Sequence, residues 1–363
     1  MIAAEHLDRD AAKLLVVDAE GGFCHRARNA LASLFRPGDL IVANDAATLP
    51  ASLGGVHGRT CAPIEIRLAG WISLADPTRF IAIAFGAGDH RTRTEGRPAP
   101  PALSPGDRLA LGPLQAMVRR RLDHARLVEL AFAGEGATVL AGIARHGRPI
   151  QYAHVRQPLA LWDVWTSIAA DPIAFEPPSA AFALDWRTLA AWRRRGIGFA
   201  TLTHAAGISS TGDPALDARL PFDEPYRIPE RTAAAIGETQ ARGGRIVATG
   251  TSVVRALEAA AGAGGRVRAG DGMASRRIGR STALRVVAAI LTGVHEPGES
   301  HYELLRAFAD DCVLERLSAA VETHGYRTHE FGDSMLIERR RRGLQHTDET
   351  NTSRRHPCAT SSW

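Results

Sequence analysis

Apolar residues follow two different patterns along this chain of 363 residues. Over the first 55 residues, and again after residue 150, strand-like apolar runs alternate with helical segments, as in "DWRTLAAWRRRG" followed by "IGFATLTH". Between residues 56 and 150 the pattern changes to short strand-like runs separated by glycine and proline. The first pattern is typical of an α/β sheet and the second of a small barrel or sandwich. We therefore expect an α/β fold, with a main α/β domain of residues 1–55 and 151–338 and an inserted small β-barrel-like domain at 56–150.

Composition is that of a globular protein. Hydrophobic residues make up 45% of the chain, and no apolar run reaches the roughly 18 residues that a membrane span requires. The N-terminal "MIAAEHLDRDAAKLLVVD" carries too many charges for a secretory signal, so we expect a cytoplasmic protein without a membrane partner. The four cysteines are scattered, and no histidine pair has metal-ligand spacing. We expect neither a metal nor a redox cofactor.

Positive charge is concentrated at the C-terminus. Of the net charge of +5, six arginines and two acidic residues in 339–363 account for +4. The rest of that segment is rich in Ser, Thr, Asn and Gln, so we expect residues 339–363 to form a disordered basic tail. The charge of the chain is therefore weak support for nucleic-acid binding by residues 1–338.

Polar residues follow several of the predicted strands. In an open parallel sheet, ligands bind beyond the carboxyl ends of the strands, where such residues would gather. Each residue also has a structural alternative, as a helix cap, a turn residue or a hydrogen-bonded core histidine. The residues are Asn44, Asp45, Thr203, His204, Gly250, Thr251, Ser252, His295, Glu299, Ser300, Glu330, Gly332 and Asp333.

Arg255 is an unusual residue for its place in the sequence. It falls near the start of the helical "TSVVRALEAA", where a cation adds to the positive end of the helix dipole and costs about 0.3–1 kcal/mol if exposed. Gly250 permits a tight turn immediately before this helix. We therefore expect Gly250, Thr251, Ser252 and Arg255 to form a pocket for an anion.

Common nucleotide and hydrolase motifs are missing from the sequence. There is no complete P-loop, no G-x-G-x-x-G and no G-x-S-x-G, which disfavours a nucleotide kinase, a classical dehydrogenase and a serine hydrolase. Three consecutive arginines occur at 119–121 and again at 193–195. No aromatic residues of the kind that stack on bases are interleaved with them, so we interpret both runs as solvated charge.

Four segments, in order, resemble blocks of one protein family. They are "PGDLIVANDAATLPASLGG", "GGRIVATGTSVVRALEAA", "STALRVVAAILTGVHEP" with "AFAD" after it, and "YRTHEFGDSMLI". The family is that of S-adenosylmethionine:tRNA ribosyltransferase-isomerase, in queuosine biosynthesis, and the resemblance covers about residues 2–338. It implies an α/β domain with an inserted β-barrel.

The resemblance also implies an activity. Members of the family transfer the ribosyl group of S-adenosylmethionine onto 7-aminomethyl-7-deazaguanine in tRNA and isomerise it. The chain would accordingly be a transferase and isomerase with S-adenosylmethionine as cosubstrate and the tRNA anticodon stem-loop as partner, without a metal or redox cofactor. A sulfonium acidifies the adjacent carbon, so a placed base can start such a reaction.

Roles for individual residues follow from the resemblance. His204, His295 and Glu224 would transfer protons, and Glu224 matches the acid of the family's His-Ser-Glu block. Asn44 and Asp333 would orient the ligand. The anion pocket of Arg255 would hold the methionine carboxylate or an RNA phosphate, and the resemblance does not choose between them.

Three positions depart from the family pattern. Ala47 stands where the family has a basic residue, Ala183 stands where it has a histidine, and Phe222 replaces the histidine of the His-Ser-Glu block. An alanine cannot donate, accept or shuttle a proton. Two alternatives therefore stay open: a divergent paralogue that uses S-adenosylmethionine with a small-molecule acceptor, and a non-catalytic ligand-binding protein.

Overall fold

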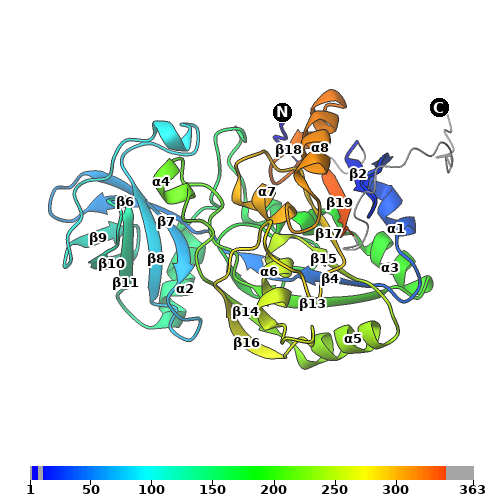
Figure 1. Cartoon of the computed structure of the whole chain (residues 1–363). Helices are drawn as coiled ribbons and strands as arrows, with labels where there is room; N and C mark the ends of the chain where they lie inside the picture. Colours follow the sequence, from blue (N-terminus) through cyan, green and yellow to red (C-terminus); the bar gives the residue numbers. More distant parts are fainter. Residues whose placement is uncertain (1, 7–10, 341–363) are drawn as a thin grey trace.

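The computed structural model describes residues 2–6 and 11–340. Figure 1 shows a large sheet with helices packed against it, next to a separate group of strands. Of the predicted basic tail, only Arg339 and Arg340 are among the described residues, and the rest of that prediction lies outside them.

The large sheet has nine strands: β2 (Lys13–Val17), β3 (Phe23–Ala27), β4 (Leu40–Asn44), β13 (Gly198–His204), β14 (Glu224–Ile228), β15 (Ile246–Thr249), β16 (Gly270–Ala274), β17 (Ala289–Gly293) and β19 (Ser334–Glu338). Their order in the sheet is β16-β14-β13-β4-β15-β17-β19-β2-β3. The central strands β13, β4, β15 and β17 run parallel to one another, and β19 runs antiparallel to β17. The carboxyl ends of the four parallel strands therefore share one edge of the sheet with the amino end of β19.

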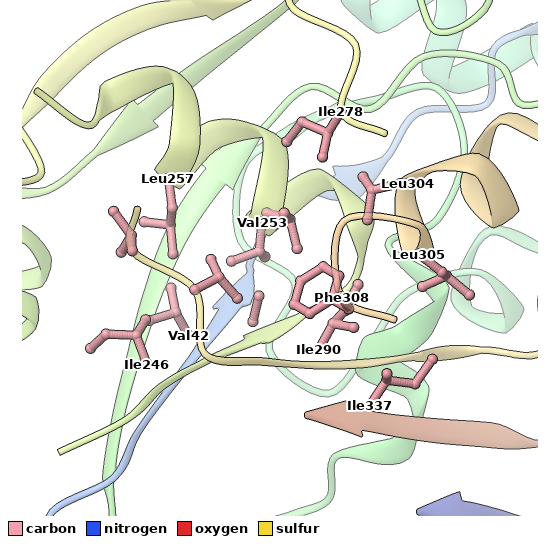
Figure 2. Close-up of a cluster of buried hydrophobic side chains, with 14 of the residues drawn as sticks. Val42, Ile246, Val253, Leu257, Ile278, Ile290, Leu304, Leu305, Phe308 and Ile337 are labelled. Carbon is pink, nitrogen blue, oxygen red and sulfur yellow. The ribbon is translucent and has the colours of Figure 1, made fainter. Parts of the chain in front are cut away.

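Central strands are apolar on both sides because helices cover both faces of the sheet. Consecutive residues alternate between two cores: Ile41 and Val247 lie in one, and Val42 and Ala248 lie in the other. The first core includes residues of α1 (Leu31–Leu34) and α3 (Trp186–Arg194). The second, drawn in Figure 2, is covered by α5 (Glu230–Ala241), α6 (Thr251–Ala260), α7 (Ser300–Leu305) and α8 (Asp311–Thr323).

The separate group of strands in Figure 1 forms a closed six-stranded barrel. Its strands are β6 (Ser52–His57), β7 (Pro63–Trp71), β8 (Arg79–Phe85), β9 (Arg108–Leu111), β10 (Leu114–Arg121) and β11 (Leu127–Phe132). The predicted fold class, an α/β fold with a small barrel, is confirmed. Five of the six strands, β7 to β11, were predicted, because they coincide with short strand-like runs between residues 56 and 150. β6 was not, because its two central glycines resemble a turn in the sequence, whereas Gly55 is needed there: a Cβ on it would lie 2.0 Å from the Ala110 carbonyl oxygen.

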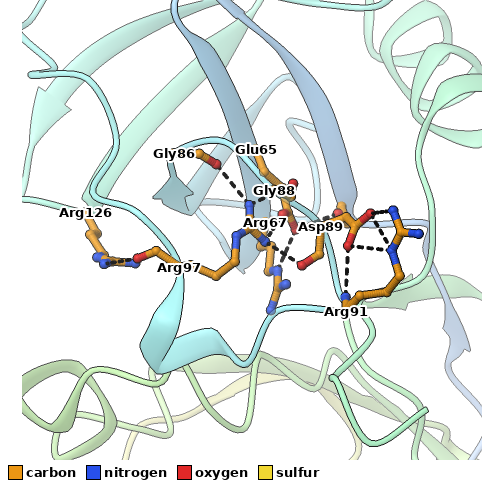
Figure 3. Close-up of polar contacts among 9 residues, drawn as sticks. Glu65, Arg67, Gly86, Gly88, Asp89, Arg91, Arg97 and Arg126 are labelled. Atoms are coloured by element: carbon orange, nitrogen blue, oxygen red, sulfur yellow. Dashed lines mark hydrogen bonds and ion pairs between the residues drawn. The ribbon is translucent and has the colours of Figure 1, made fainter. Parts of the chain in front are cut away.

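A buried ionic network holds the barrel strands to the loop after β8 (Figure 3). Glu65 accepts a hydrogen bond from Arg67 Nε at 2.7 Å and another from Arg97. Arg97 also donates to the carbonyl oxygens of Gly86 and Gly88, at 2.9 and 3.0 Å. Burial disfavours the Glu65 carboxylate, but the two guanidinium groups outweigh it and lower the pKa of Glu65. These contacts give Glu65, Arg67 and Arg97 a structural role in the barrel.

Smaller elements complete the fold. β1 (Ile2–Ala3) pairs with β18 (Arg327–Thr328), and β5 (Ala47–Thr48) pairs with β12 (Pro172–Ala174), both in parallel. The remaining helical segments are α2 (Gly136–His146), α4 (Pro214–Asp217) and the 3₁₀ helices at 28–30, 94–96, 161–163 and η4 (Ser179–Ala183). We keep the division into domains at residues 55, 150 and 338 as a proposal.

No helix among the described residues combines the length and the apolar character that crossing a bilayer requires.

Candidate functional site

The predicted strand ends meet at one edge of the large sheet. Asn44 ends β4, His204 ends β13, Gly250 follows β15 and Gly293 ends β17. Asp333 precedes β19, which runs the other way and so begins at the same edge. Five segments that are far apart in the sequence therefore supply residues to one place, as expected for a ligand site in an open parallel sheet.

A small recess lies at this edge, with a cavity volume of about 10 Å³. We call it the strand-edge recess. It is formed by η4, by the end of β17 and by the turn that precedes β19. Its lining residues are Arg28, Ser179, Ala180, Phe182, Ala183, Gly293, His329, Glu330, Gly332, Asp333 and Ser334.

Asn44 acts as a clamp between β4 and β13. Its side-chain oxygen accepts from the amide nitrogens of His204 and Ala46, at 2.9 and 3.0 Å. Its Nδ2 donates to the His204 carbonyl oxygen at 2.9 Å and lies 3.4 Å from Ser252 Oγ. These bonds occupy the Asn44 amide, so its direct effect is to hold the ends of two strands in position.

Arg255 does not lie free to meet an external anion, which corrects the expectation from the sequence. Its side chain is 5% exposed, pairs with the Glu224 carboxylate, and donates to the carbonyl oxygens of Phe222 and Ala274 at 3.1 and 2.6 Å. The physical reason is that these partners belong to β14, β16 and the segment before β14, strands that the sequence did not reveal. An internal carboxylate thus neutralises the guanidinium.

His204 and Glu224 form a buried group with Arg255. The His204 side chain is fully buried, and its Nε2 lies 3.5 Å from Glu224 Oε2. Burial, with the nearby charge of Arg255, lowers the pKa of His204 to about 3. Burial raises the pKa of Glu224, against the opposing effect of Arg255 and of the Gly207 amide, which donates to Glu224 Oε1 at 2.7 Å. His204 is therefore neutral near pH 7.

His295 is more accessible than His204, with 16% of its side chain exposed. Its Nε2 lies 2.8 Å from Thr292 Oγ1, and its Nδ1 lies 3.8 Å from Glu299 Oε2. Burial, followed by the charges of His301 and His329, holds the pKa of His295 well below its usual value. Ser300 begins α7, and the next residue, His301, packs its ring 5.0 Å from that of His295.

His301 is a candidate that the sequence did not single out. Burial, followed by the charge of Arg255, lowers its pKa to about 4. The signal for it was weak, because it follows no strand directly. Its place one residue after the predicted Glu299-Ser300 pair was the available indication.

The turn between β15 and α6 brings a further predicted segment to the site. Gly250 has φ 96° and is the N-cap residue of α6, which no side chain caps, so the alternative role of Thr251 and Ser252 as caps is not what the structure has. Both are half-buried in the first turn of the helix. A Cβ at Gly250 would lie 3.4 Å from the Cβ of Ala180, in the wall of the strand-edge recess.

Asp333 is bound to backbone and lines the recess at the same time. Its carboxylate accepts from the amide nitrogens of Lys13 and Arg327, at 2.6 and 2.8 Å. It therefore fixes the turn that carries His329 and Glu330 next to the start of β2. These two recess residues and Arg28, which donates to the Gly332 carbonyl oxygen, complete the wall on this side.

The sheet, its strand-edge recess and the attached closed barrel define an α/β protein with a recess at the carboxyl ends of parallel strands, the edge at which open α/β sheets bind ligands. A family model described as queuosine biosynthesis protein matches residues 1–337. The chain belongs to this family.

Curated relatives and one solved structure are similar over almost the whole chain. The S-adenosylmethionine:tRNA ribosyltransferase-isomerase of Thermus thermophilus is 33% identical, over 93% of this chain and 95% of the relative. The protein of the same name from Moorella thermoacetica is 30% identical, over 91% of this chain and 93% of the relative. A crystal structure of S-adenosylmethionine tRNA ribosyltransferase from Thermotoga maritima has 23% identity and a TM-score of 0.49, and covers 93% of this chain and 96% of that one.

Proposed function

We propose that this protein transfers the ribosyl group of S-adenosylmethionine onto 7-aminomethyl-7-deazaguanine in tRNA and isomerises it. Its similarity to enzymes of that name, over more than nine-tenths of the chain, supports the proposal. The observation that carries it is the composition of the strand-edge recess. Gly293 and Asp333, from two segments that resemble family blocks, line this recess together.

The reaction needs a base and two leaving groups. The sulfonium of S-adenosylmethionine acidifies the adjacent carbon, from which a base removes a proton. The aminomethyl nitrogen forms a bond to the ribosyl group. Adenine and methionine leave with the electron pairs of the bonds that break, and the sugar becomes an epoxycyclopentane.

We assign the role of base to His295. Its lowered pKa keeps the imidazole neutral near pH 7, and part of the ring is exposed. With Thr292 Oγ1 accepting from Nε2, the lone pair lies on Nδ1, which is the form that a general base requires. His204 and Glu224 take a positioning role instead, because both are buried against Arg255.

The amino end of α6 is our candidate for the methionine carboxylate. The first amide groups of a helix have no partner within the helix and attract an anion. Thr251 and Ser252 add two hydroxyl groups there. Arg255 supports this end of the helix through Glu224, and Asn44 supports it through Ser252.

The function is tested by the release of adenine. We expect purified protein to release adenine from S-adenosylmethionine only when an anticodon stem-loop containing 7-aminomethyl-7-deazaguanine is present. Chromatography of the reaction mixture measures the adenine, and the unmodified stem-loop is the control. Release with a free small amine but not with RNA would identify the paralogue. Saturable binding without release in any mixture would identify a ligand-binding protein.

Gly250→Ala tests the contact between the α6 turn and the recess. A side chain at φ 96° is strained, so we expect a loss of about 1–2 kcal/mol of stability. The new Cβ also presses on Ala180, so we expect weaker binding of S-adenosylmethionine. Denaturant unfolding and calorimetry measure the two effects.

Gly270→Ala is the matched control for this substitution. Gly270 has φ 105°, and nothing lies within 4 Å of the position of its Cβ. It should lose similar stability and keep its affinity for S-adenosylmethionine. Equal affinities for the two variants would contradict a ligand site at the Gly250 turn.

A further inference from the structure

Three potential metal ligands meet beside the strand-edge recess. His154 comes from the loop after α2, whereas His329 and Glu330 come from the turn between β18 and β19. Each offers one ligand atom, and these atoms lie within 4.8 Å of one another. Within residues 2–6 and 11–340, this is the only group of three or more histidine, cysteine, aspartate or glutamate side chains that is placed to hold one metal ion. Local spacing could not reveal it, because two distant segments form it.

Distances within the group suit a shared ion. His154 Nε2 lies 3.3 Å from Glu330 Oε2, and two ligands at tetrahedral angles on one zinc ion are about 3.4 Å apart for bonds of 2.0–2.2 Å. His154 Nε2 is buried and makes no hydrogen bond within the described part of the chain. The rings of His154 and His329 are stacked, with centroids 4.3 Å apart, so the two imidazoles lie next to each other beside Glu330.

Neighbouring residues hold these ligands in place. The ring of Tyr152 lies nearly parallel to that of His154, at 8° and 6.3 Å, and its hydroxyl donates to Glu176. His329 has φ 67°, a conformation that costs energy for a residue other than glycine. Its carbonyl oxygen accepts from the Gly332 amide at 3.0 Å, which keeps the turn in that conformation. Strain of this kind is typical of functional sites.

We propose that His154, His329 and Glu330 bind a divalent transition-metal ion of the zinc type. Two histidines and one glutamate are a ligand set of catalytic zinc sites, which keep a fourth position open. His329 and Glu330 line the strand-edge recess, so the open position faces the recess. The proposal replaces the expectation from the sequence that no metal is bound. It rests on these contacts and is independent of the proposed function.

Binding of metal alone tests the site. Untagged full-length protein is stripped with a chelator, dialysed and titrated with Co²⁺ and with Zn²⁺. We expect the site to bind one equivalent of either ion. Visible absorption typical of low-symmetry cobalt reports Co²⁺ binding, and calorimetry reports Zn²⁺ binding. Mg²⁺ and Ca²⁺ should not compete, because they prefer oxygen ligands.

Glu330→Gln and His154→Ala are the informative variants. Each should weaken Zn²⁺ binding by about 100-fold or more, since even an outer-shell change costs 10–100-fold. Glu330→Gln keeps the shape of the side chain, so it reports on the site even if His154→Ala does not fold.

His324→Ala is the matched control. His324 stacks on His25, with centroids 3.9 Å apart, and so forms a second histidine pair near the surface. The His324→Ala variant should bind Zn²⁺ with the affinity of the wild type. Zn²⁺ binding that is absent from the wild type, or unchanged in both Glu330→Gln and His154→Ala, would overturn the proposal whether or not the protein releases adenine.

Discussion

Replacing Glu224 by alanine should lower the free energy of unfolding by about 3–5 kcal/mol. The substitution leaves the guanidinium of Arg255 in a site where its side chain is 5% exposed and has two carbonyl oxygens but no counter-charge. Removing one partner of a buried ion pair is costly for this reason, even where the intact pair adds little to stability. Urea unfolding followed by circular dichroism measures the change.

The double variant Glu224→Ala/Arg255→Met separates the buried charge from other effects. It removes both charges, so we expect it to recover part of the lost stability. Glu238→Ala is the control for losing an exposed partner: Glu238 pairs with Arg242 at side-chain exposures of 66% and 78%, and its loss should cost no more than about 0.5 kcal/mol. A Glu224→Ala variant as stable as Glu238→Ala would contradict the buried pair.

His295→Ala should lower kcat by about 10²–10⁴-fold, the usual contribution of a general acid or base. The prediction rests on the proposed function and on the neutral, partly exposed imidazole. Affinity for S-adenosylmethionine should change little, since proton removal is not part of binding. Steady-state adenine release measures kcat, and calorimetry measures affinity.

Two further measurements decide whether His295 acts as the base. Added imidazole should restore part of the activity of His295→Ala, because the deletion leaves space for it. Thr292→Val should lose less activity than His295→Ala, since Thr292 only orients the ring through the contact of 2.8 Å with Nε2. A kcat of His295→Ala within about twofold of the wild type would remove this residue from proton transfer.

Sequence periodicity was sufficient for most of the fold. β4 and β15 are continuous apolar runs, and α3 has one apolar face, so each follows from its own residues. The edge strand β16 and its neighbour β14 were missed because "GDGMA" and "EPYRI" contain glycine or proline and lack apolar alternation. Strands of this kind are specified by their neighbours more than by their own propensity.

The candidate site shows the same contrast between what the local sequence predicts and what neighbouring segments decide. That Asn44, His204, Gly250, His295 and Asp333 belong near one edge could be argued from strand ends, because parallel strands place their carboxyl ends together. What each side chain contacts could not be argued in this way. Asn44 and Asp333 accept hydrogen bonds from backbone amides, and no residue pattern predicts such bonds.

The order of apolar runs and polar strand ends by itself determined that this chain forms a parallel α/β sheet with a barrel beside it, and where on the sheet a ligand would lie. Those features depend on the pattern of apolar residues within single segments, which are continuous runs in the buried strands and one apolar face in the helices. Only the tertiary structure decided that Arg255 is neutralised by Glu224 and that His154 reaches His329 and Glu330. Charge compensation and metal-ligand geometry depend on distances of a few ångströms between segments that the sequence keeps far apart.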